Sequence, residues 1–454
     1  MPKARPTPAP GRALPASTTA EPTAARTVAR ADLSEPSTGT AEVPVPVDGR
    51  ISPKSPLTRL VGSDVEEFST RHWGRKPLLR RTGDRFEDLL DLDGVDEMLS
   101  RRGLRTPFLR MARNGSVIDS RSFTGGGGAG AEIGDQVVDD RVAALFAEGG
   151  TIVLQALHRM WPGIIDFTTG LTDELGHPAQ VNAYITPPSS QGFSAHYDVH
   201  DVFVLQFAGR KHWKVHAPVH PAPLRDQQWH EHADAVAARA RDDAPVIDEV
   251  LEPGDVMYLP RGWLHSATAL GDVSAHLTIG VHVVTKFALV EALTALVGAD
   301  DRLRTSLPLG IDIADPGVLD DHLESVRDDL ITALKAVPAE DIARYVRDRA
   351  WKGNRPEPLA PVAAATFALN LVDGDSVRRR DGLRFRVRDA RNGRVVIELP
   401  DRHISLPDST ATALSALLDG NTWRVGEVPG MDRTDQLVLV RRLLREGVLM
   451  AAGA

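Results

Sequence analysis

Short apolar runs rich in β-branched residues alternate with turn residues between about residue 150 and residue 285. Runs of this kind, bounded by Gly, Pro and Asp, are typical of strands, and many of them in succession indicate a closed β structure. The pattern predicts a mostly β core of barrel type, with strands at residues 151–157, 180–186, 202–207, 212–215, 246–251 and 275–284.

The spacing of apolar positions becomes helical after the last of these runs. Leu289, Leu293 and Leu296 are three or four residues apart, which puts them on one face of a helix. A longer stretch from Val318 to Tyr345 has the same character. We therefore expect a helical middle region over residues 286–360.

The last part of the chain, residues 361–454, combines two expected strands with two expected helices, as winged-helix-like units do. The strands lie at 383–387 and 395–399, and the helices end at Gly420 and Gly447. The apolar stripes of the two helices are Leu414, Leu417 and Leu418, then Leu437, Val440, Leu443 and Leu444. This part also contains an arginine cluster with two interpretations. The arginines would contact phosphates if the unit bound DNA, or they would simply lie on a solvent-exposed pair of basic strands. The cluster is Arg378, Arg379, Arg380, Arg384, Arg386 and Arg388.

The segment before the core divides into two parts. Residues 1–54 are rich in Pro, Ala, Thr and Ser without hydrophobic periodicity, so we expect a disordered tail. Order should begin near the capping-box pattern Ser63–Glu66, with a helix that ends near Gly74. The run Gly125–Gly128 lacks a following Gly-Lys-Ser or Gly-Lys-Thr, which favours a mobile loop over a phosphate-binding loop.

Composition limits the class of protein. The 454 residues suggest two or three domains, and the net charge of −9, with both signs mixed, makes nucleic acid an unlikely partner. The chain has no Cys, which excludes disulfides and thiol catalysis. It contains neither an apolar run of ~18 residues nor a secretory apolar core, so we expect no membrane association and a cytoplasmic location.

Two segments supply a metal-ligand set. In an extended segment His196 and Asp198 project to the same face, and His265 follows a Pro-Gly turn at the end of another apolar run. Two imidazoles and one carboxylate on one face of an octahedron are the donors that non-haem Fe(II) oxygenases use. A surface His-x-Asp dipeptide would look the same locally, so the interpretation depends on the surrounding motifs.

Those motifs resemble the JmjC-type ribosomal oxygenases, which are Fe(II)- and 2-oxoglutarate-dependent protein hydroxylases on a double-stranded β-helix (cupin) barrel. The resemblance covers most of the chain after about residue 55. It implies a catalytic domain at 55–285, followed by the helical region and the winged-helix-like domain. The matching segments are Trp73–Leu79, Leu154–Arg159, Asn182–Pro188, Gly192–Asp198, Asp201–Gln206 and Gly209–Val215.

The resemblance also assigns site residues. His196, Asp198 and His265 match its iron ligands, and Lys211, at the start of the strand expected after a turn at Gly209, matches the residue that pairs with the distal carboxylate of 2-oxoglutarate. Asn182 matches a polar residue that contacts the cosubstrate.

The chain departs from the family pattern at two places. Gly280 stands where some relatives carry a small hydroxyl residue near the cosubstrate, which leaves Thr278 as a weaker candidate for that contact. His200 stands where an acidic or small residue is more usual, and it is either a substrate contact or a rim histidine. Both departures concern the substrate rather than the metal.

The implied activity is hydroxylation of a His or Arg side chain of a ribosomal protein, in a barrel mouth lined by Tyr184, Arg261 and Trp263. Two alternatives stay open: the same chemistry on a small metabolite or biosynthetic peptide, or a non-catalytic cupin and winged-helix binding module. Some relatives dimerise through helices at 286–360, and an intramolecular helical layer would give the same sequence pattern.

Overall fold

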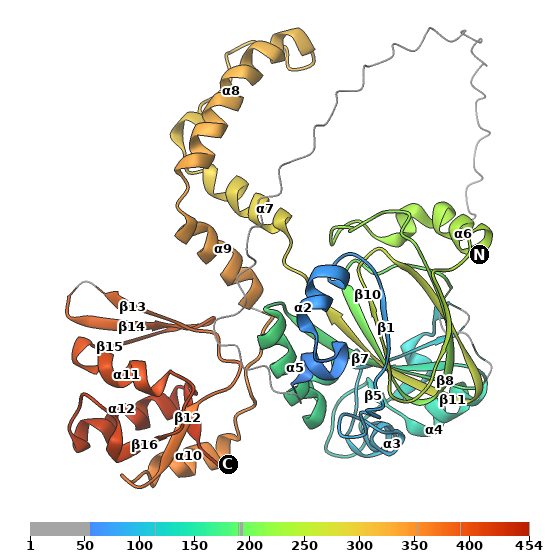
Figure 1. Ribbon diagram of the computed structural model, residues 1–454, viewed down its shortest axis with the longest axis horizontal. Helices are drawn as coiled ribbons and strands as arrows, with labels where there is room; N and C mark the ends of the chain where they lie inside the picture. The colour runs from blue at the N-terminus through green and yellow to red at the C-terminus, as the bar shows by residue number, and fades with distance from the viewer. Residues whose placement is uncertain are drawn as a thin grey trace, which may run out of the picture. The chain divides into compact units, whose positions relative to one another are not determined.

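The computed structural model describes residues 55–113, 115–188, 190, 194–351, 353–390 and 392–453, and the tail expected at 1–54 lies outside this part of the chain. Figure 1 shows the β core, the helices that follow it in yellow and orange, and the C-terminal part in red. Within the described residues, no helix is both long enough and apolar enough to cross a membrane.

The segment before the core is helical earlier than expected. Helix α1 (Pro56–Val61) precedes the expected start, and the Ser55 hydroxyl caps it by accepting from the Thr58 N–H at 3.2 Å. The cap of α2 (Val65–Glu67) is Asp64 rather than Ser63. A π-helical turn, η1 (Phe68–His72), completes the helix, which ends near Gly74 as predicted.

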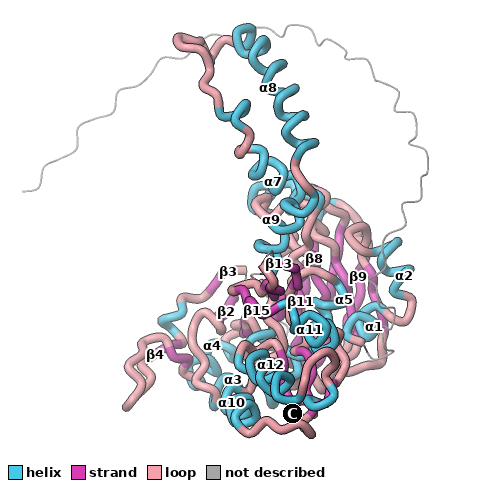
Figure 2. The backbone as a smooth tube through the Cα atoms, turned by 90° about the vertical axis from the view of Figure 1, so that its left-hand side faces the viewer, coloured by secondary structure: helices cyan, strands magenta, loops and turns pink. Residues whose placement is uncertain are grey.

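One antiparallel sheet of nine strands forms the core. Figure 2 draws all strands, those of the C-terminal part included, in magenta. The strand order is β1-β10-β8-β11-β7-β6-β2-β3, and β9 pairs with β8. Each of the six predicted runs contains or overlaps a strand, so the mostly β core is confirmed. The strands are β1 (Leu78–Arg81), β2 (Leu109–Arg113), β3 (Ser116–Val117), β6 (Thr151–Leu154), β7 (Ala179–Thr186), β8 (Asp201–His216), β9 (Ile247–Leu251), β10 (Asp255–Leu259) and β11 (Leu264–Val281).

The runs at 202–207 and 212–215 belong to a single strand, β8, so the predicted turn at Gly209 was wrong. Gly209 adopts φ +57°, and a Cβ there would lie 2.0 Å from the Val273 carbonyl oxygen. Only glycine therefore allows β8 to remain paired with β11 where the pairing register shifts. Lys211 consequently lies inside a long bent strand rather than at the start of a new one.

The two faces of the sheet have different surroundings. Phe203 and Leu277 belong to the large apolar core that includes Leu57 of α1 and Phe167 of α5 (Pro162–Leu175). Alternate residues such as Val204 point to the other face, where a smaller apolar cluster forms. Polar residues share this second face in two rows that cross β7, β11 and β8. In one row Thr278 of β11 pairs with Asn182 of β7 and Val204 of β8, and in the other His276 of β11 pairs with Tyr184 of β7 and Gln206 of β8. The face with the smaller cluster is therefore the one that can hold a polar site.

Shorter elements complete the first part of the chain. They are α3 (Leu92–Arg101), α4 (Asp139–Ala147), α6 (Ala233–Asp242) and a small hairpin of β4 (Thr124–Gly125) with β5 (Gln136–Val137). Gly125 is thus part of a paired strand, although it was predicted to begin a mobile loop. The 3-10 turns of the described residues are η2 (Ser120–Ser122), η3 (Leu157–Arg159), η4 (Trp229–His232), η5 (Asp301–Arg304), η6 (Asp408–Thr410) and η7 (Val425–Glu427).

The region after the core is helical, as the spacing of leucines predicted. It contains α7 (Lys286–Val297), α8 (Pro316–Ala336) and α9 (Ala339–Trp351). The stretch 318–345 is divided between two helices because Pro338 disfavours helical geometry at Val337, where α8 ends.

The C-terminal part has an apolar core of its own. Its sheets have the orders β16-β12-β17 and β13-β14-β15, and the two predicted leucine stripes lie in α11 and α12. The elements are α10 (Pro361–Leu369), β12 (Ser376–Arg379), β13 (Arg386–Ala390), β14 (Arg394–Glu398), β15 (His403–Pro407), α11 (Ala411–Leu417), β16 (Trp423–Arg424), α12 (Arg433–Arg445) and β17 (Leu449–Ala451).

Candidate metal centre

A two-residue antiparallel bridge brings the two expected ligand segments together. The His196 N–H donates to the His265 carbonyl at 3.2 Å, and the His265 N–H donates to the His196 carbonyl at 2.8 Å. His265 is the second residue of β11, whereas His196 lies in an irregular segment before β8. Residues 197–200 are not part of a strand. The alternation of side chains along an extended strand therefore does not determine the direction of the His200 side chain.

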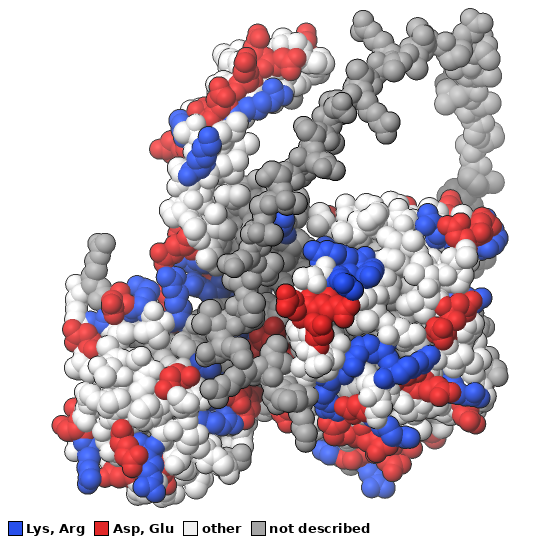
Figure 3. Space-filling model, viewed as in Figure 1, with Lys and Arg blue, Asp and Glu red and all other residues white. Residues whose placement is uncertain are grey.

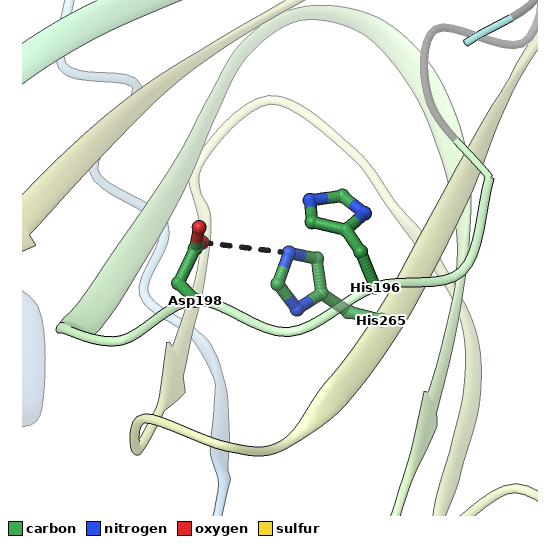
Figure 4. A group of neighbouring side chains, drawn as sticks. All are labelled: His196, Asp198 and His265. Carbon is green, nitrogen blue, oxygen red and sulfur yellow. Dashed lines mark ion pairs between the residues drawn. The ribbon is translucent and has the colours of Figure 1, made fainter. Parts of the chain in front are cut away.

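The side chains of the two segments converge, as Figure 4 shows. The ligating atoms of His196, Asp198 and His265 lie within 4.8 Å of one another, and Asp198 Oδ2 is 3.7 Å from His265 Nε2. Within the described residues, this is the one group of three or more His, Asp or Glu side chains close enough to share an ion.

Backbone carbonyls fix the orientation of both imidazoles. His196 Nδ1 lies 2.7 Å from the Ser194 oxygen, and His265 Nδ1 lies 3.1 Å from the Trp263 oxygen. A carbonyl can only accept, so each Nδ1 carries the proton and each Nε2 keeps its lone pair for a metal. Sequence reasoning did not identify these partners, which come from residues two positions before each ligand.

The electrostatics of the site give the protonation states that metal binding requires. Burial alone would raise the pKa of Asp198, but the imidazoles of His200, His265 and His196, together with Arg110, lower it. Burial lowers the pKa of His265, His196 lowers it further, and Asp198 opposes the change. At neutral pH Asp198 is ionised and His265 is neutral.

The residues expected around 2-oxoglutarate lie on the face of the sheet that carries the smaller apolar cluster, which we call the inward face. Lys211 is 4 % exposed, and its Nζ donates to Thr186 Oγ1 at 3.1 Å. Burial lowers its pKa to about 7. Asn182 pairs in register with Thr278, and its Oδ1 accepts the Ala156 N–H at 3.0 Å. This face of the sheet therefore offers a desolvated amine that would gain from an anionic partner.

The residues expected to line the mouth have different surroundings. Tyr184 stacks on the buried His276, with ring centroids 5.2 Å apart. Trp263 packs against the inner apolar cluster. Arg261 is turned toward a buried carboxylate instead, with its Nη1 3.4 Å from Asp201 Oδ1. Its geometry favours a structural role over contact with substrate.

His200 occupies the space that Gly280 leaves open. A Cβ on Gly280 would lie 2.5 Å from His200 Cδ2 and 2.6 Å from His200 Nε2. The His200 ring also stacks on His282, with centroids 5.4 Å apart. The two departures from the family pattern, at 200 and at 280, are therefore linked, because the His200 ring fits only while residue 280 lacks a side chain.

The site contains three further residues that were not predicted from the sequence. His276 is buried, and its Nδ1 has no hydrogen-bond partner among the described residues. Arg110 of β2 acts electrostatically on both Asp198 and Tyr184. The ring of Trp229 lies 6.3 Å from that of His196. The two-residue alternation from Thr278 could have indicated His276, whereas no local pattern marks Arg110 or Trp229.

Comparisons with known proteins agree with the motifs. A family model described as the JmjC domain matches residues 167–289. The chain is 30% identical over 325 residues to the bifunctional lysine-specific demethylase and histidyl-hydroxylase NO66 of Aedes aegypti, covering 69% of this chain and 49% of that protein. It is 29% identical over 253 residues to ribosomal oxygenase 1 of Gallus gallus, covering 54% of this chain and 40% of that protein.

Among solved structures, the chain is similar to YcfD, a ribosomal oxygenase from Escherichia coli in complex with cobalt and 2-oxoglutarate. The identity is 18%, the TM-score is 0.49, and the match covers 86% of this chain and 98% of that chain. The chain spans about half the length or less of the curated relatives cited above. We therefore identify it as a JmjC-domain protein related to the ribosomal oxygenases.

Proposed function

We propose that this protein is an Fe(II)- and 2-oxoglutarate-dependent dioxygenase that hydroxylates a His or Arg side chain of a ribosomal protein. The observation that carries the proposal is the convergence of His196, Asp198 and His265 within 4.8 Å, with the Nδ1 of each imidazole hydrogen-bonded to a backbone carbonyl. Two imidazole nitrogens and one carboxylate oxygen suit iron and leave positions for cosubstrate and O2. When bound, iron would supply the oxidative decarboxylation of 2-oxoglutarate and the transfer of one oxygen atom to a C–H bond.

The role proposed for Lys211 is to hold the distal carboxylate of 2-oxoglutarate. A buried amine without a counter-charge is unfavourable, and a dianion in the pocket would restore its charged form. Thr186 already holds the Nζ in place at 3.1 Å. Thr278 and Asn182, which pair in the same ladder, would contact the rest of the cosubstrate.

His200 and Tyr184 are the residues we propose for substrate contact, with Trp263 beside them. The groups that act electrostatically on Asp198 are three imidazoles and Arg110, so the surroundings are cationic or neutral. A neutral imidazole would enter such a site more easily than a guanidinium. This favours a histidine target, and the NO66 relatives are named as histidyl-hydroxylases as well as lysine-specific demethylases.

A ribosomal protein suits the charge of the chain. Ribosomal proteins are basic as a class, whereas this chain carries a net charge of −9, with both signs interspersed on the face drawn in Figure 3. The C-terminal arginines support partner docking more than phosphate binding. Arg378 pairs with Glu357 at 2.7 Å, and Arg379 donates to the Leu418 carbonyl at 2.8 Å. We propose that residues 361–454 form a winged-helix-like docking unit.

The helical region would pair with a second copy of the chain. Helix α7 packs against α8 and α9, yet Phe287, Leu289 and Val290 each remain about 45 % exposed. Apolar side chains this exposed on one short helix are typical of an interface.

The activity is tested by the formation of succinate from 2-oxoglutarate with added Fe(II). The wild type should form succinate, and His196→Ala should lose at least ~100-fold, because one of three ligands is removed. Absence of succinate from the wild type, with ribosomal proteins present, would contradict the proposal and favour a non-catalytic binding module.

The burial of Lys211 should make stability depend on pH in the metal-free protein. Because its pKa falls from 10.5 to about 7, the unfolded chain binds a proton there between these values that the folded chain does not. The free energy of unfolding should therefore rise with pH over this window. Lys211→Met should remove this rise, as measured by urea unfolding at several pH values, and should raise the KM for 2-oxoglutarate. Equal pH slopes for the two proteins would mean that the amine is solvated.

The fit between His200 and Gly280 gives a test of substrate contact. His200→Ala should keep succinate formation without substrate but lower oxygen incorporation into ribosomal proteins by about 10-fold or more, as followed by intact mass. Gly280→Ala should have the same effect in the wild type, because it displaces His200, and no added effect in the His200→Ala background. Additive effects of the two substitutions would argue against the steric coupling.

The proposed dimer is tested by light scattering on the full chain. The wild type should have twice the mass of a variant that carries both Phe287→Glu and Val290→Glu, because buried charges disrupt an apolar interface. A monomeric wild type would contradict pairing through α7 and favour a helical layer within one chain.

A further inference from the structure

Asp201 is a buried carboxylate that the proposed chemistry does not use. It is the first residue of β8 and is 0% exposed. Its Oδ1 accepts the Arg261 backbone N–H at 3.1 Å and lies 3.4 Å from Arg261 Nη1, while its Oδ2 accepts from the Tyr258 hydroxyl. The Tyr258 oxygen in turn accepts the Gly74 N–H at 2.8 Å. A carboxylate so enclosed is stable only while these donors stay in place.

The segment that Asp201 holds is the loop Pro260–Trp263, which joins β10 to β11. The two residues after Arg261 contact both ligand segments. The Gly262 N–H donates to the Asp198 carbonyl at 3.0 Å, and the Trp263 carbonyl accepts from His265 Nδ1 at 3.1 Å. The loop therefore determines where the Asp198 backbone lies and how the His265 ring is turned.

Local geometry leaves this loop little freedom to move independently of Asp201. Gly262 adopts φ +89°, and a Cβ there would lie 2.7 Å from the His220 carbonyl and 2.8 Å from Pro223 Cδ. The backbone at Gly262 is thus closely packed against His220 and Pro223. Shifting the loop would break a hydrogen bond to Asp198 and leave Asp201 short of a donor at the same time.

We infer that Asp201 is a positioning residue of the metal centre, which acts by fixing the Pro260–Trp263 loop through Arg261 and thereby placing Asp198 and His265. The inference rests on the proposed metal centre but not on any particular substrate. It gives Arg261 a function other than contact with substrate. Tyr258 extends the same network to the segment that ends at Gly74.

Asp255 provides a matched control at the far end of β10. It is also buried, pairs with one arginine, Arg81, and accepts one backbone N–H, from Glu252 at 2.7 Å. It therefore resembles Asp201 in burial and in partners. It differs in lying at the end of β10 that does not lead into the loop.

The decisive experiment compares Asp201→Asn with Asp255→Asn in Co²⁺ binding, followed by visible absorption on the full chain without 2-oxoglutarate or substrate. Both variants should lose stability in urea unfolding, because each leaves an arginine without its carboxylate. Only Asp201→Asn should lose metal affinity, by about 10- to 100-fold, as other supports of metal ligands do. Equal losses in the two variants, or an unchanged affinity in Asp201→Asn, would overturn the inference.

A second readout uses the metal-free protein. Amide hydrogen exchange of the peptide that contains Gly262 should be faster in Asp201→Asn than in the wild type, and unchanged in Asp255→Asn. If Asp201→Asn fails to fold, Tyr258→Phe removes one donor to the same carboxylate and should show a smaller change in the same direction. Protection that is unaltered in the folded variant would contradict the inference. Neither readout requires turnover, so a protein that forms no succinate but shows these effects would refute the activity and retain the positioning role.

Discussion

The pair of backbone hydrogen bonds between His196 and His265 is the contact on which the proposed centre depends. His196 follows a loop, whereas His265 is the second residue of the long strand β11, and the two residues form an isolated antiparallel bridge. Within the described residues, this bridge places two imidazoles with ring centroids 4.5 Å apart. Asp198 joins them because it is two residues from His196. Without the bridge, the donors would lie on separate segments and could not share an ion.

Backbone groups on both ligand segments support the bridge. A carbonyl can only accept a hydrogen bond and an N–H can only donate one, so each group fixes its partner in one arrangement. Carbonyls behind each imidazole fix its tautomer, and the Gly262 N–H holds the backbone of Asp198. These are short-range hydrogen bonds in a partly buried site, where an unsatisfied partner is costly. The proposed metal centre is thus preorganised by backbone groups, which a change of side chain on the surface would not alter.

The face of the sheet that carries Lys211 and His276 combines apolar packing with buried polar groups. Lys211 and His276 both have a lowered pKa because burial disfavours their charged forms. Their positions on one face follow from the register of β8, β11 and β7, while the opposite face packs against helices. Burying these groups lowers the stability of the protein without a ligand, whereas an anionic ligand would gain a cationic partner. Such residues are typical of a binding site rather than of a structural core.

The sequence alone determined the mostly β core, the helical region and the leucine stripes, because periodicity is a local property. The grouping of His196 and Asp198 with His265 was predicted from motifs that resemble a known family, and the bridge between distant segments brings the three together. The tertiary structure decided the features that depend on distant strands. It bent β8 at Gly209 instead of ending it, turned Arg261 toward Asp201, fitted His200 into the space beside Gly280 and brought Arg110 and His276 to the site. Each of these results from contacts between segments far apart in the chain, and spacing along the sequence carries no record of which side chains will meet across a sheet.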